Sequence, residues 1–175
     1  ASNLLDARTA IDAINRLARH GATMCESPTH RFDIRGTAEV RRNVDLPISE
    51  HIYHETHARA LIDAGAIDIM NICLTFAGGL TPAMRLMEIA REARLRTLIG
   101  TTQELSIGTA AQVHLGCAAS TLTDISDPTG PCLYAEDITA ARVLYRANEA
   151  MLPEGPGFGI APDPALLERQ RTDLA

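Results

Sequence analysis

The chain contains no lysine, because all 16 of its basic residues are arginine. Schiff-base chemistry, amine general bases and P-loop phosphate binding through a lysine are therefore excluded within this sequence. Tryptophan is also absent, and aromatic residues make up only 3% of the chain, too few for the stacking platforms that bind nucleic-acid bases. The formal net charge of -6 leaves no basic surface, so we expect no nucleic-acid partner.

Long apolar runs and paired cysteines are missing as well. No stretch approaches the roughly 20 apolar residues that a membrane span requires, so we expect no membrane partner. The four cysteines, Cys25, Cys73, Cys117 and Cys132, form no CxxC pair, and each lies among apolar or small residues. This spacing predicts reduced, buried thiols in a cytoplasmic protein rather than a zinc ribbon or a redox motif.

Short apolar runs alternate with longer amphipathic stretches over most of the chain. The pattern predicts helices over residues 5–20, 34–43, 56–64, 81–95 and 107–119, and strands over residues 22–25, 46–49, 67–74 and 97–102. The run 67–74 is apolar on both faces, which is typical of a buried parallel strand. Consecutive βα units of this kind form either a (β/α) barrel or an open doubly wound sheet.

The pattern changes after about residue 121. Residues 127–131 form a turn-rich break, residues 143–145 predict a short strand, residues 153–159 an irregular loop, and the tail from Asp163 a short polar helix. We therefore expect a partial (β/α) barrel over residues 1–131 and a separate C-terminal segment over residues 132–175.

Polar residues follow the expected strands. They are Asn3, Glu26, Glu50 with His51, Asn71 with Cys73, and Gln103 with Glu104. The carboxyl ends of parallel strands share one rim, where the chemistry of such folds collects. Since carboxylate and amide oxygens suit Mg²⁺, we expect Asn3, Glu26, Glu50 and Glu104 to meet around one mouth that binds this cation. The alternative at any single position is a glutamate that caps a helix or pairs with an arginine.

Several segments, taken in order, match the motifs of a known family. They are Asn3 (the Asn of an Asp-x-Asn strand end), residues 25–28 (Ile-Glu-Gln-Pro), residues 47–50 (the segment leading into Asp-Glu), residues 68–72 with 78–81 (a sixth strand and a double glycine), residues 104–114 (Glu-Ser-x-Ile-Gly-x-Ala-Ala-x-x-His) and residues 153–159 (Pro-x-Gly-Pro-Gly-x-Gly). This ordered set covers nearly the whole chain and resembles the C-terminal half of the enolase superfamily, of the mandelate racemase and muconate-lactonizing enzyme type.

The resemblance implies a modified TIM barrel whose C-terminal segment returns to an N-terminal α+β capping domain. It also implies three carboxylate ligands for Mg²⁺, a small carboxylate substrate, and metal-assisted abstraction of the proton next to that carboxylate. The implied metal ligands in this sequence are Glu26, Glu50 and Asn3, and the implied catalytic residues are Glu104 and Cys73.

The chain departs from the family pattern at several of these positions. Ala1 stands where the family has its first metal-binding Asp, Glu50 or His51 replaces the third, and Cys73 replaces the sixth-strand lysine. The leading prediction is an isomerase or lyase, which includes racemases, cycloisomerases and dehydratases. Because the lysine bases are absent, the alternative is a catalytically degenerate homologue that acts as a binding or structural module.

The number of βα units indicates an incomplete barrel. We expect about six strands, the third to the eighth, whereas a closed barrel has eight strands and runs to roughly 250 residues. An open remnant would expose parallel edges. We therefore expect the chain to be part of a longer or split protein, which forms a homo-oligomer or associates with an N-terminal portion.

The histidines and the double glycine leave other possibilities open. His51, His54 and His57 recur every three residues and could share a helix face that binds Zn²⁺, although solvated or capping histidines are commoner. His114 lies in a helix of small residues and is expected to be a satisfied packing residue. The glycines 78–79 precede a helix, where they either bind an anionic group or only allow the turn.

Overall fold

The computed structural model describes residues 3–170, which divide into two compact units. The first unit contains residues 3–98 and Thr121–Ile125, and the second contains Ile99–Ser120 and residues 126–170. The boundary expected at residues 131 and 132 stays a prediction, and each unit is described by itself below.

Four short strands form a parallel sheet in their order along the chain. They are β1 (Cys25–Glu26), β2 (Ile48–His51), β3 (Ile69–Ile72) and β4 (Arg96–Ile99). Cys25 pairs with Ile48 and Ser49 pairs with Ile69, and both of these pairings are parallel. Because every strand lies beside the next one in the sequence, the carboxyl ends of β1, β2 and β3 come together at one edge, as the sequence predicts.

Five helices alternate with these strands in the first unit. They are α1 (Ala7–Ala18), α2 (Ile34–Arg42), α3 (Glu55–Asp63), the single-turn α4 (Leu74–Ala77) and α5 (Leu80–Glu92). Three of them begin at a side chain that accepts a hydrogen bond from the first turn: Asp6 for α1, Asp33 for α2 and His54 for α3. The predicted helix over residues 5–20 therefore begins only after the Asp6 cap.

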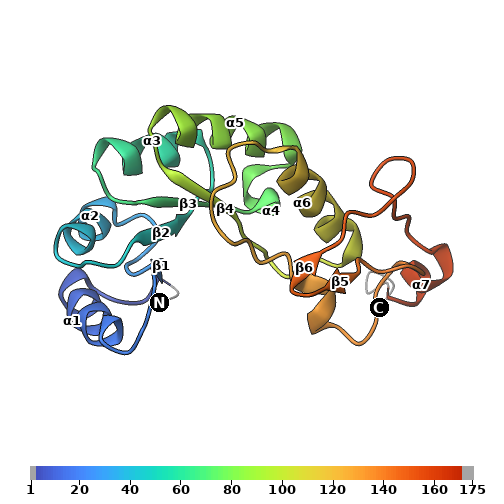
Figure 1. The fold of residues 1–175 in the computed structure, drawn as a ribbon, viewed down its shortest axis with the longest axis horizontal. Helices are drawn as coiled ribbons and strands as arrows, with labels where there is room; N and C mark the ends of the chain where they lie inside the picture. Colours follow the sequence, from blue (N-terminus) through green and yellow to red (C-terminus); the bar gives the residue numbers. More distant parts are fainter. Residues whose placement is uncertain (1–2, 171–175) are drawn as a thin grey trace. The chain divides into compact units, whose positions relative to one another are not determined.

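The helices α1, α2, α3 and α5 lie side by side along one side of the strands (Figure 1), and neighbouring helices contact each other in that order. Between the two layers lies a core of aliphatic side chains. Its fully buried members include Ile48, Leu61, Ile69, Met70 and Ile72. A parallel sheet in sequential order with helices on one side is the arrangement of a (β/α) barrel wall and not of an open sheet covered on both faces.

Two irregular segments extend the sheet on either side. Leu5 forms a single parallel bridge with Thr29, and the backbone N–H of Thr123 donates to the carbonyl of Thr97 in β4. The Thr123 hydroxyl also accepts a hydrogen bond from the Thr97 N–H, in place of a backbone carbonyl. The expectation of about six strands was therefore wrong in detail: the described residues contain four regular parallel strands, because these flanking segments pair through isolated contacts. The incomplete (β/α) barrel stays a prediction.

The chain after β3 differs from the predicted strand over residues 67–74. The strand ends at Ile72, and the following residues form α4, with Cys73 at its N-cap. Gly78 and Gly79 have φ angles of +89° and +117°, which side-chain-bearing residues rarely adopt, so they allow the sharp connection from α4 to α5. Helix α5 begins at Leu80 with Gly79 as its N-cap, one residue before the start of the helix predicted over residues 81–95.

The second unit is built on helix α6 (Ser106–Ala118), which precedes the 3₁₀ helix η1 (Gly130–Leu133). A two-stranded antiparallel hairpin follows, β5 (Tyr145–Arg146) with β6 (Glu149–Ala150), and then α7 (Pro164–Arg169). The strand expected over residues 143–145 thus begins later, and the polar helix expected after Asp163 is confirmed, with Asp163 as its N-cap. A small core of Ala110, Val113 and Val143 lies under Tyr145, Phe158 and Ile160.

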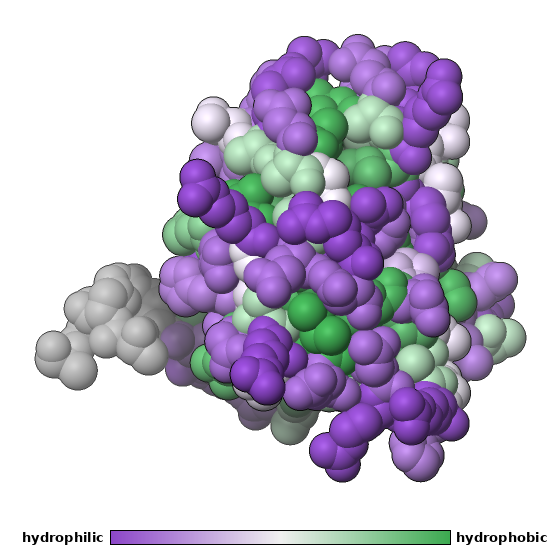
Figure 2. Space-filling view, turned by 90° about the vertical axis from the view of Figure 1, so that its left-hand side faces the viewer, coloured by the Kyte–Doolittle hydropathy of each residue, from purple (hydrophilic) through white to green (hydrophobic). Residues whose placement is uncertain are grey.

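Hydrophilic side chains cover most of the face seen in Figure 2, and hydrophobic side chains form separate patches between them. No helix among residues 3–170 is both long and apolar enough to cross a membrane. The cytoplasmic location stays a prediction.

Candidate active site

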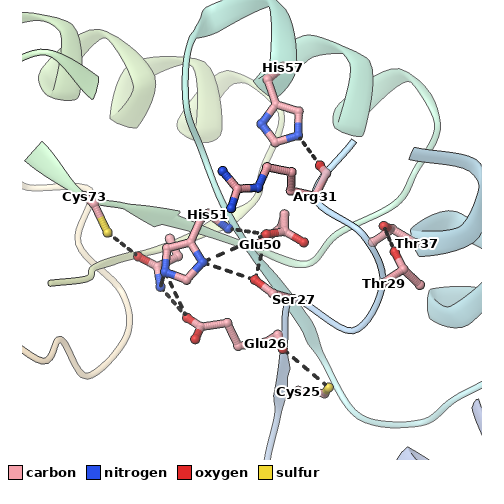
Figure 3. Close-up of polar contacts among 11 residues, drawn as sticks. Cys25, Glu26, Ser27, Thr29, Arg31, Thr37, Glu50, His51, His57 and Cys73 are labelled. Carbon is pink, nitrogen blue, oxygen red and sulfur yellow. Dashed lines mark hydrogen bonds and ion pairs between the residues drawn. The ribbon is translucent and has the colours of Figure 1, made fainter. Parts of the chain in front are cut away.

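Polar side chains gather where β1, β2 and β3 end (Figure 3). Glu26 is the last residue of β1, Glu50 and His51 end β2, and Asn71 lies in β3. Strand pairing aligns these ends: Glu26 pairs with Ser49, and His51 pairs with Asn71. The structure therefore brings Glu26, Glu50, His51 and Asn71 together at this part of the sheet edge.

The carboxyl group of Glu50 is completely buried and held by two donors. Its Oε1 accepts hydrogen bonds from the Ser27 hydroxyl at 2.7 Å and from the His51 backbone N–H at 2.9 Å. Its Oε2 is buried without a hydrogen-bond partner. Burial raises the pKa of this carboxyl to about 6, even though both hydrogen bonds favour the charged form.

Ser27 connects Glu50 to His51. Its hydroxyl oxygen lies 3.1 Å from His51 Nδ1, and its backbone has a φ of +47°, a left-handed conformation that costs a non-glycine residue roughly 1–2 kcal/mol. Ser27 is itself only 1% exposed. Strained backbone of this kind persists where the surrounding structure holds it, and here it places the hydroxyl between a carboxyl and an imidazole.

These contacts assign the protons of His51. Because the Ser27 hydroxyl donates to Glu50, its oxygen accepts from His51, so Nδ1 carries the hydrogen and Nε2 keeps its lone pair, which accepts from the Asn71 amide. Burial lowers the pKa of His51, and the charge of Arg31 acts in the same direction, whereas Glu26 acts against both. The imidazole is therefore neutral at pH 7, with Nε2 3.4 Å from the Asn71 amide nitrogen and 3.8 Å from Glu26 Oε1.

Glu26 and Cys73 lie on either side of the Asn71 amide. The amide nitrogen donates to Glu26 Oε1, and the amide oxygen accepts from the Cys73 thiol at 3.6 Å. The Glu26 side chain is 40% exposed, whereas Cys73 is completely buried. Glu26 is thus accessible to a ligand from solvent, and Cys73 uses its thiol proton within the cluster. The expectation of buried thiols was wrong for Cys117 and Cys132, which are exposed.

Asn3 approaches this cluster through the backbone. Its N–H donates to the carbonyl of Ser27, and its φ of +61° turns the chain before the bridge at Leu5. The side-chain Oδ1 of Asn3 is buried without a hydrogen-bond partner. Two orphaned oxygen acceptors, on Asn3 and Glu50, therefore belong to residues that both bond to Ser27.

These donors fit Mg²⁺ in a water-rich site. Mg²⁺ commonly keeps several waters and uses only one or two protein carboxylates, which Glu26 and Glu50 supply. The unpaired Oε2 of Glu50 is the kind of buried oxygen that a hard cation satisfies. Among residues 3–170 no three or more His, Cys, Asp or Glu side chains group to hold a metal ion, so the three-carboxylate set of the family pattern is not formed there.

Glu104 lies in the second unit, in the connection between β4 and α6. Its Oε2 accepts from the Thr101 hydroxyl at 2.6 Å, the Thr102 N–H at 3.0 Å and the Gln112 amide at 3.0 Å, and its Oε1 accepts from the Thr102 hydroxyl at 2.6 Å. These donors hold the carboxyl in one position. Its meeting with Glu26 and Glu50 stays a prediction.

His51, His54 and His57 do not share the helix face that their spacing left open, and His54 is a capping histidine, the commoner arrangement. His51 lies in β2, His54 caps α3, and only His57 lies within the helix. His57 is 4% exposed, and its Nε2 donates to the carbonyl of Arg31 at 3.1 Å. His114 packs against Phe158 with ring centres 5.6 Å apart, but its Nε2 is buried without a partner, so it is not the satisfied residue expected.

The central roles of Ser27 and His51 were missed by sequence reasoning. Ser27 directly follows a strand-end glutamate, and His51 directly follows Glu50, but the hydroxyl–imidazole contact depends on the left-handed backbone at Ser27. No pattern of residue types predicts a positive φ at a serine.

The buried carboxyl of Glu50 predicts a pH-dependent stability. Since its pKa rises from 4.5 when unfolded to about 6 when folded, its contribution to stability is complete below pH 4.5 and is lost as the pH rises through 6. Glu50→Gln removes this loss, so with chelator present the variant should gain about 2 kcal/mol relative to the parent between pH 4.5 and 7.5. Urea unfolding at several pH values measures this gain.

The variant Glu39→Gln removes one charge from an exposed position on α2 and serves as the control. An equal pH dependence for the two variants would show that Glu50 does not ionise in a buried site.

Comparison with known proteins identifies the chain's relatives. Residues 1–166 match the family described as "Enolase C-terminal domain-like". The chain is 31% identical over 157 residues to muconate cycloisomerase 1 of Rhodococcus opacus, covering 89% of this chain and 42% of that protein. It is also 31% identical over 175 residues to an N-succinylamino acid racemase of Amycolatopsis, covering 96% of this chain and 47% of that protein.

The fold matches that of solved relatives. The muconate lactonizing enzyme of Pseudomonas putida superimposes with a TM-score of 0.89 at 29% identity, over 97% of this chain and 48% of that structure. The N-succinyl Arg/Lys racemase of Bacillus cereus gives a TM-score of 0.87 at 26% identity, over 94% of this chain and 44% of that structure. The chain thus spans less than half the length of these relatives, and it belongs to the enolase C-terminal domain-like family, of the mandelate racemase and muconate-lactonizing type.

Proposed function

We propose that this chain forms the metal-binding and proton-transferring part of an enolase-superfamily isomerase that acts on a small carboxylate. The observation that carries the proposal is the Glu50–Ser27–His51 contact beside Glu26, at the carboxyl ends of parallel strands. The relatives support the reaction class, since their names include a cycloisomerase and racemases. A lyase of the same superfamily is the neighbouring possibility.

Glu26 and Glu50 would hold Mg²⁺ in this proposal, with the Asn3 side-chain oxygen as a third donor. A bound Mg²⁺ would stabilise the negative charge that develops when a proton leaves the carbon next to a carboxylate. Such a proton is too weakly acidic for a side-chain base without this help. The exposed Glu26 is the ligand that a cation from solvent reaches first.

His51 is the proton acceptor of the proposed site. Its Nε2 carries the lone pair, the imidazole is neutral, and its side chain is 21% exposed beside Glu26, which is 40% exposed. Ser27 and Glu50 hold the ring through Nδ1 and would stabilise the imidazolium after it takes a proton. In a chain without lysine, this histidine takes the place of an amine base.

Cys73 and Glu104 keep narrower roles. Cys73 is buried and donates to Asn71, so we propose that it orients the amide beside Glu26. The carboxyl of Glu104 is held in place by its threonine and glutamine donors, and its proposed part is to position a substrate hydroxyl, amine or protonated group. Association with another chain segment or a second copy also stays a proposal.

The alternative function is a binding or structural module without catalysis. Two observations favour it: the chain has no lysine, and residues 3–170 contain no group of three or more His, Cys, Asp or Glu side chains that could hold a metal ion, where the family pattern has three carboxylates. A measurement of Mg²⁺ binding distinguishes the enzymatic function from the binding or structural one.

Calorimetric titration with MgCl₂ is the decisive experiment. We expect one saturable site in the chain and at least about a tenfold loss of affinity in Glu26→Gln, because this variant removes a charged ligand and keeps the shape. Glu39→Gln, on the exposed side of α2, should bind like the parent. Absence of saturable binding, or equal binding by Glu26→Gln, would refute the enzymatic proposal for this chain.

A further inference from the structure

An exposed aromatic cluster lies in the connections beside the candidate active site. Phe32 follows β1, Tyr53 follows β2 and Phe76 lies in α4. The ring centre of Tyr53 is 4.8 Å from that of Phe76 and 6.0 Å from that of Phe32. Phe32 is 57% exposed and Phe76 is 37% exposed, so these rings present apolar surface to solvent in a chain that has only 3% aromatic residues.

An arginine lies over the middle ring of this cluster. The guanidinium carbon of Arg31 is 5.2 Å from the centre of the Tyr53 ring, within the range of a cation–π contact. No side chain among residues 3–170 forms an ion pair with Arg31, whereas Arg41 on α2 is paired with Asp68. The flat face of this guanidinium contacts the Tyr53 ring, and the N–H groups along its edge remain available to bind another partner.

A hydrogen bond from helix α3 fixes the position of Arg31. Its backbone carbonyl accepts a hydrogen bond from the buried His57, whose ring centre lies 5.6 Å from both Phe32 and Tyr53. Helix α3 thus anchors the loop that carries Arg31 and Phe32. A charged group on an anchored loop has less conformational freedom to lose when a ligand binds.

The cluster adjoins the polar residues of the candidate active site. Phe76 lies 6.0 Å from the His51 ring, and the charge of Arg31 acts on the same imidazole. Figure 3 shows the Arg31 side chain pointing toward His51 and Glu50. A ligand held by Arg31 would therefore have its other end within reach of the proton-transfer group.

We propose that Arg31, Phe32, Tyr53 and Phe76 form a subsite for an aromatic carboxylate, with the guanidinium binding the carboxylate and the rings packing on its flat body. The planar N–H edge of arginine matches a carboxylate in a bidentate contact, and offset or edge-to-face ring contacts favour an aromatic ligand over an aliphatic one. The inference rests on the proposed function only in that the bound acid is taken as the substrate, or the substrate's distal end.

Benzoate titration followed by ligand-observed NMR tests this subsite in the full chain, with chelator present and no added Mg²⁺. We expect saturable binding of benzoate, with at least about tenfold weaker binding of the uncharged benzamide and of the ringless acetate. Arg31→Met should weaken benzoate binding at least about tenfold, and Tyr53→Leu should weaken benzoate binding more than acetate binding. Arg35→Met, an exposed arginine on α2 outside the cluster, should bind benzoate like the parent.

Two outcomes would overturn the inference: benzoate that binds equally to the parent and to Arg31→Met, or benzamide that binds as well as benzoate. Circular dichroism of each variant shows whether it is folded, and Arg31→Lys gives a second readout, since it keeps the charge and loses the planar fork. Failure of Mg²⁺ to bind while benzoate binds through Arg31 would refute the proposed function and leave the subsite standing.

Discussion

Gly130→Ala is expected to destabilise the protein by at least about 3 kcal/mol. A Cβ at this position would lie 1.8 Å from the carbonyl oxygen of Glu104 and 2.8 Å from its backbone nitrogen. The obstructing atoms belong to the backbone, so no side-chain rotation relieves the overlap. The 3₁₀ helix η1 must therefore move away from the segment that precedes α6. Urea unfolding followed by circular dichroism measures the loss.

Gly21→Ala provides the comparison for this prediction. Gly21 has a φ of +87°, and a Cβ added to it would meet no atom within 4 Å, so alanine there introduces backbone strain without overlap. We expect a loss of about 1 kcal/mol at Gly21. If Gly130→Ala costs no more than Gly21→Ala, the close approach between η1 and Glu104 does not exist in solution.

Asp137→Ala is expected to cost about 3 kcal/mol, through the N-terminus of α6. Asp137 is 6% exposed, and its carboxyl accepts from the Ser106 N–H at 3.0 Å, the Ser106 hydroxyl at 2.6 Å and the Ile138 N–H at 2.7 Å. This carboxyl, distant in the sequence, caps α6, because Leu105 at the N-cap position has no side-chain acceptor. Alanine would leave these donors buried and unpaired.

The same carboxyl predicts the pH dependence of the effect. Burial opposes its ionisation, but the hydrogen bonds from Ser106, Ile138 and Thr139 outweigh burial and lower the pKa of Asp137 below 3.8. Its contribution is therefore present above pH 3.8 and is lost as the pH falls through the lower, folded value. The difference in unfolding free energy between parent and Asp137→Ala should be constant near neutral pH and shrink in acid.

Asp163→Ala is the matched control for Asp137. Asp163 caps the exposed helix α7 by accepting from Ala165 and Leu166, and water can replace it there. We expect a loss of about 1 kcal/mol or less. Equal losses for the two variants would contradict a buried capping role for Asp137.

The alternation of helices and strands could be predicted because each element carries its own local signal. The buried residues Ile69, Met70 and Ile72 belong to a mainly apolar run, and Gly65 ends the preceding helical stretch. The ends of the helices and strands were harder to predict. Cys73 and Leu74 are as apolar as the strand before them, and yet they begin α4. That choice depends on the double glycine further along and on packing, and not on local composition.

The location of the candidate site could be predicted from the sequence, but the contacts between its side chains could not. Strand ends identify Glu26 and Glu50, because parallel strands align their carboxyl ends. Which atoms meet depends on the backbone at Ser27 and on the rotamers of His51 and Asn71, which the sequence pattern does not encode. The contact of Arg31 with Tyr53 is likewise tertiary, because 22 positions of chain separate two loops that adjacent strands bring together.

The sequential order of the sheet has a consequence for how the chain is made. Cys25 finds its partner at Ile48, and Ser49 finds its partner at Ile69, so each strand pairs with the next one to leave the ribosome. Short separations of this kind close small loops and avoid the slow search that distant strand pairing requires. Cotranslational assembly can then proceed one βα unit at a time, with each nascent strand templated by the unit already in place.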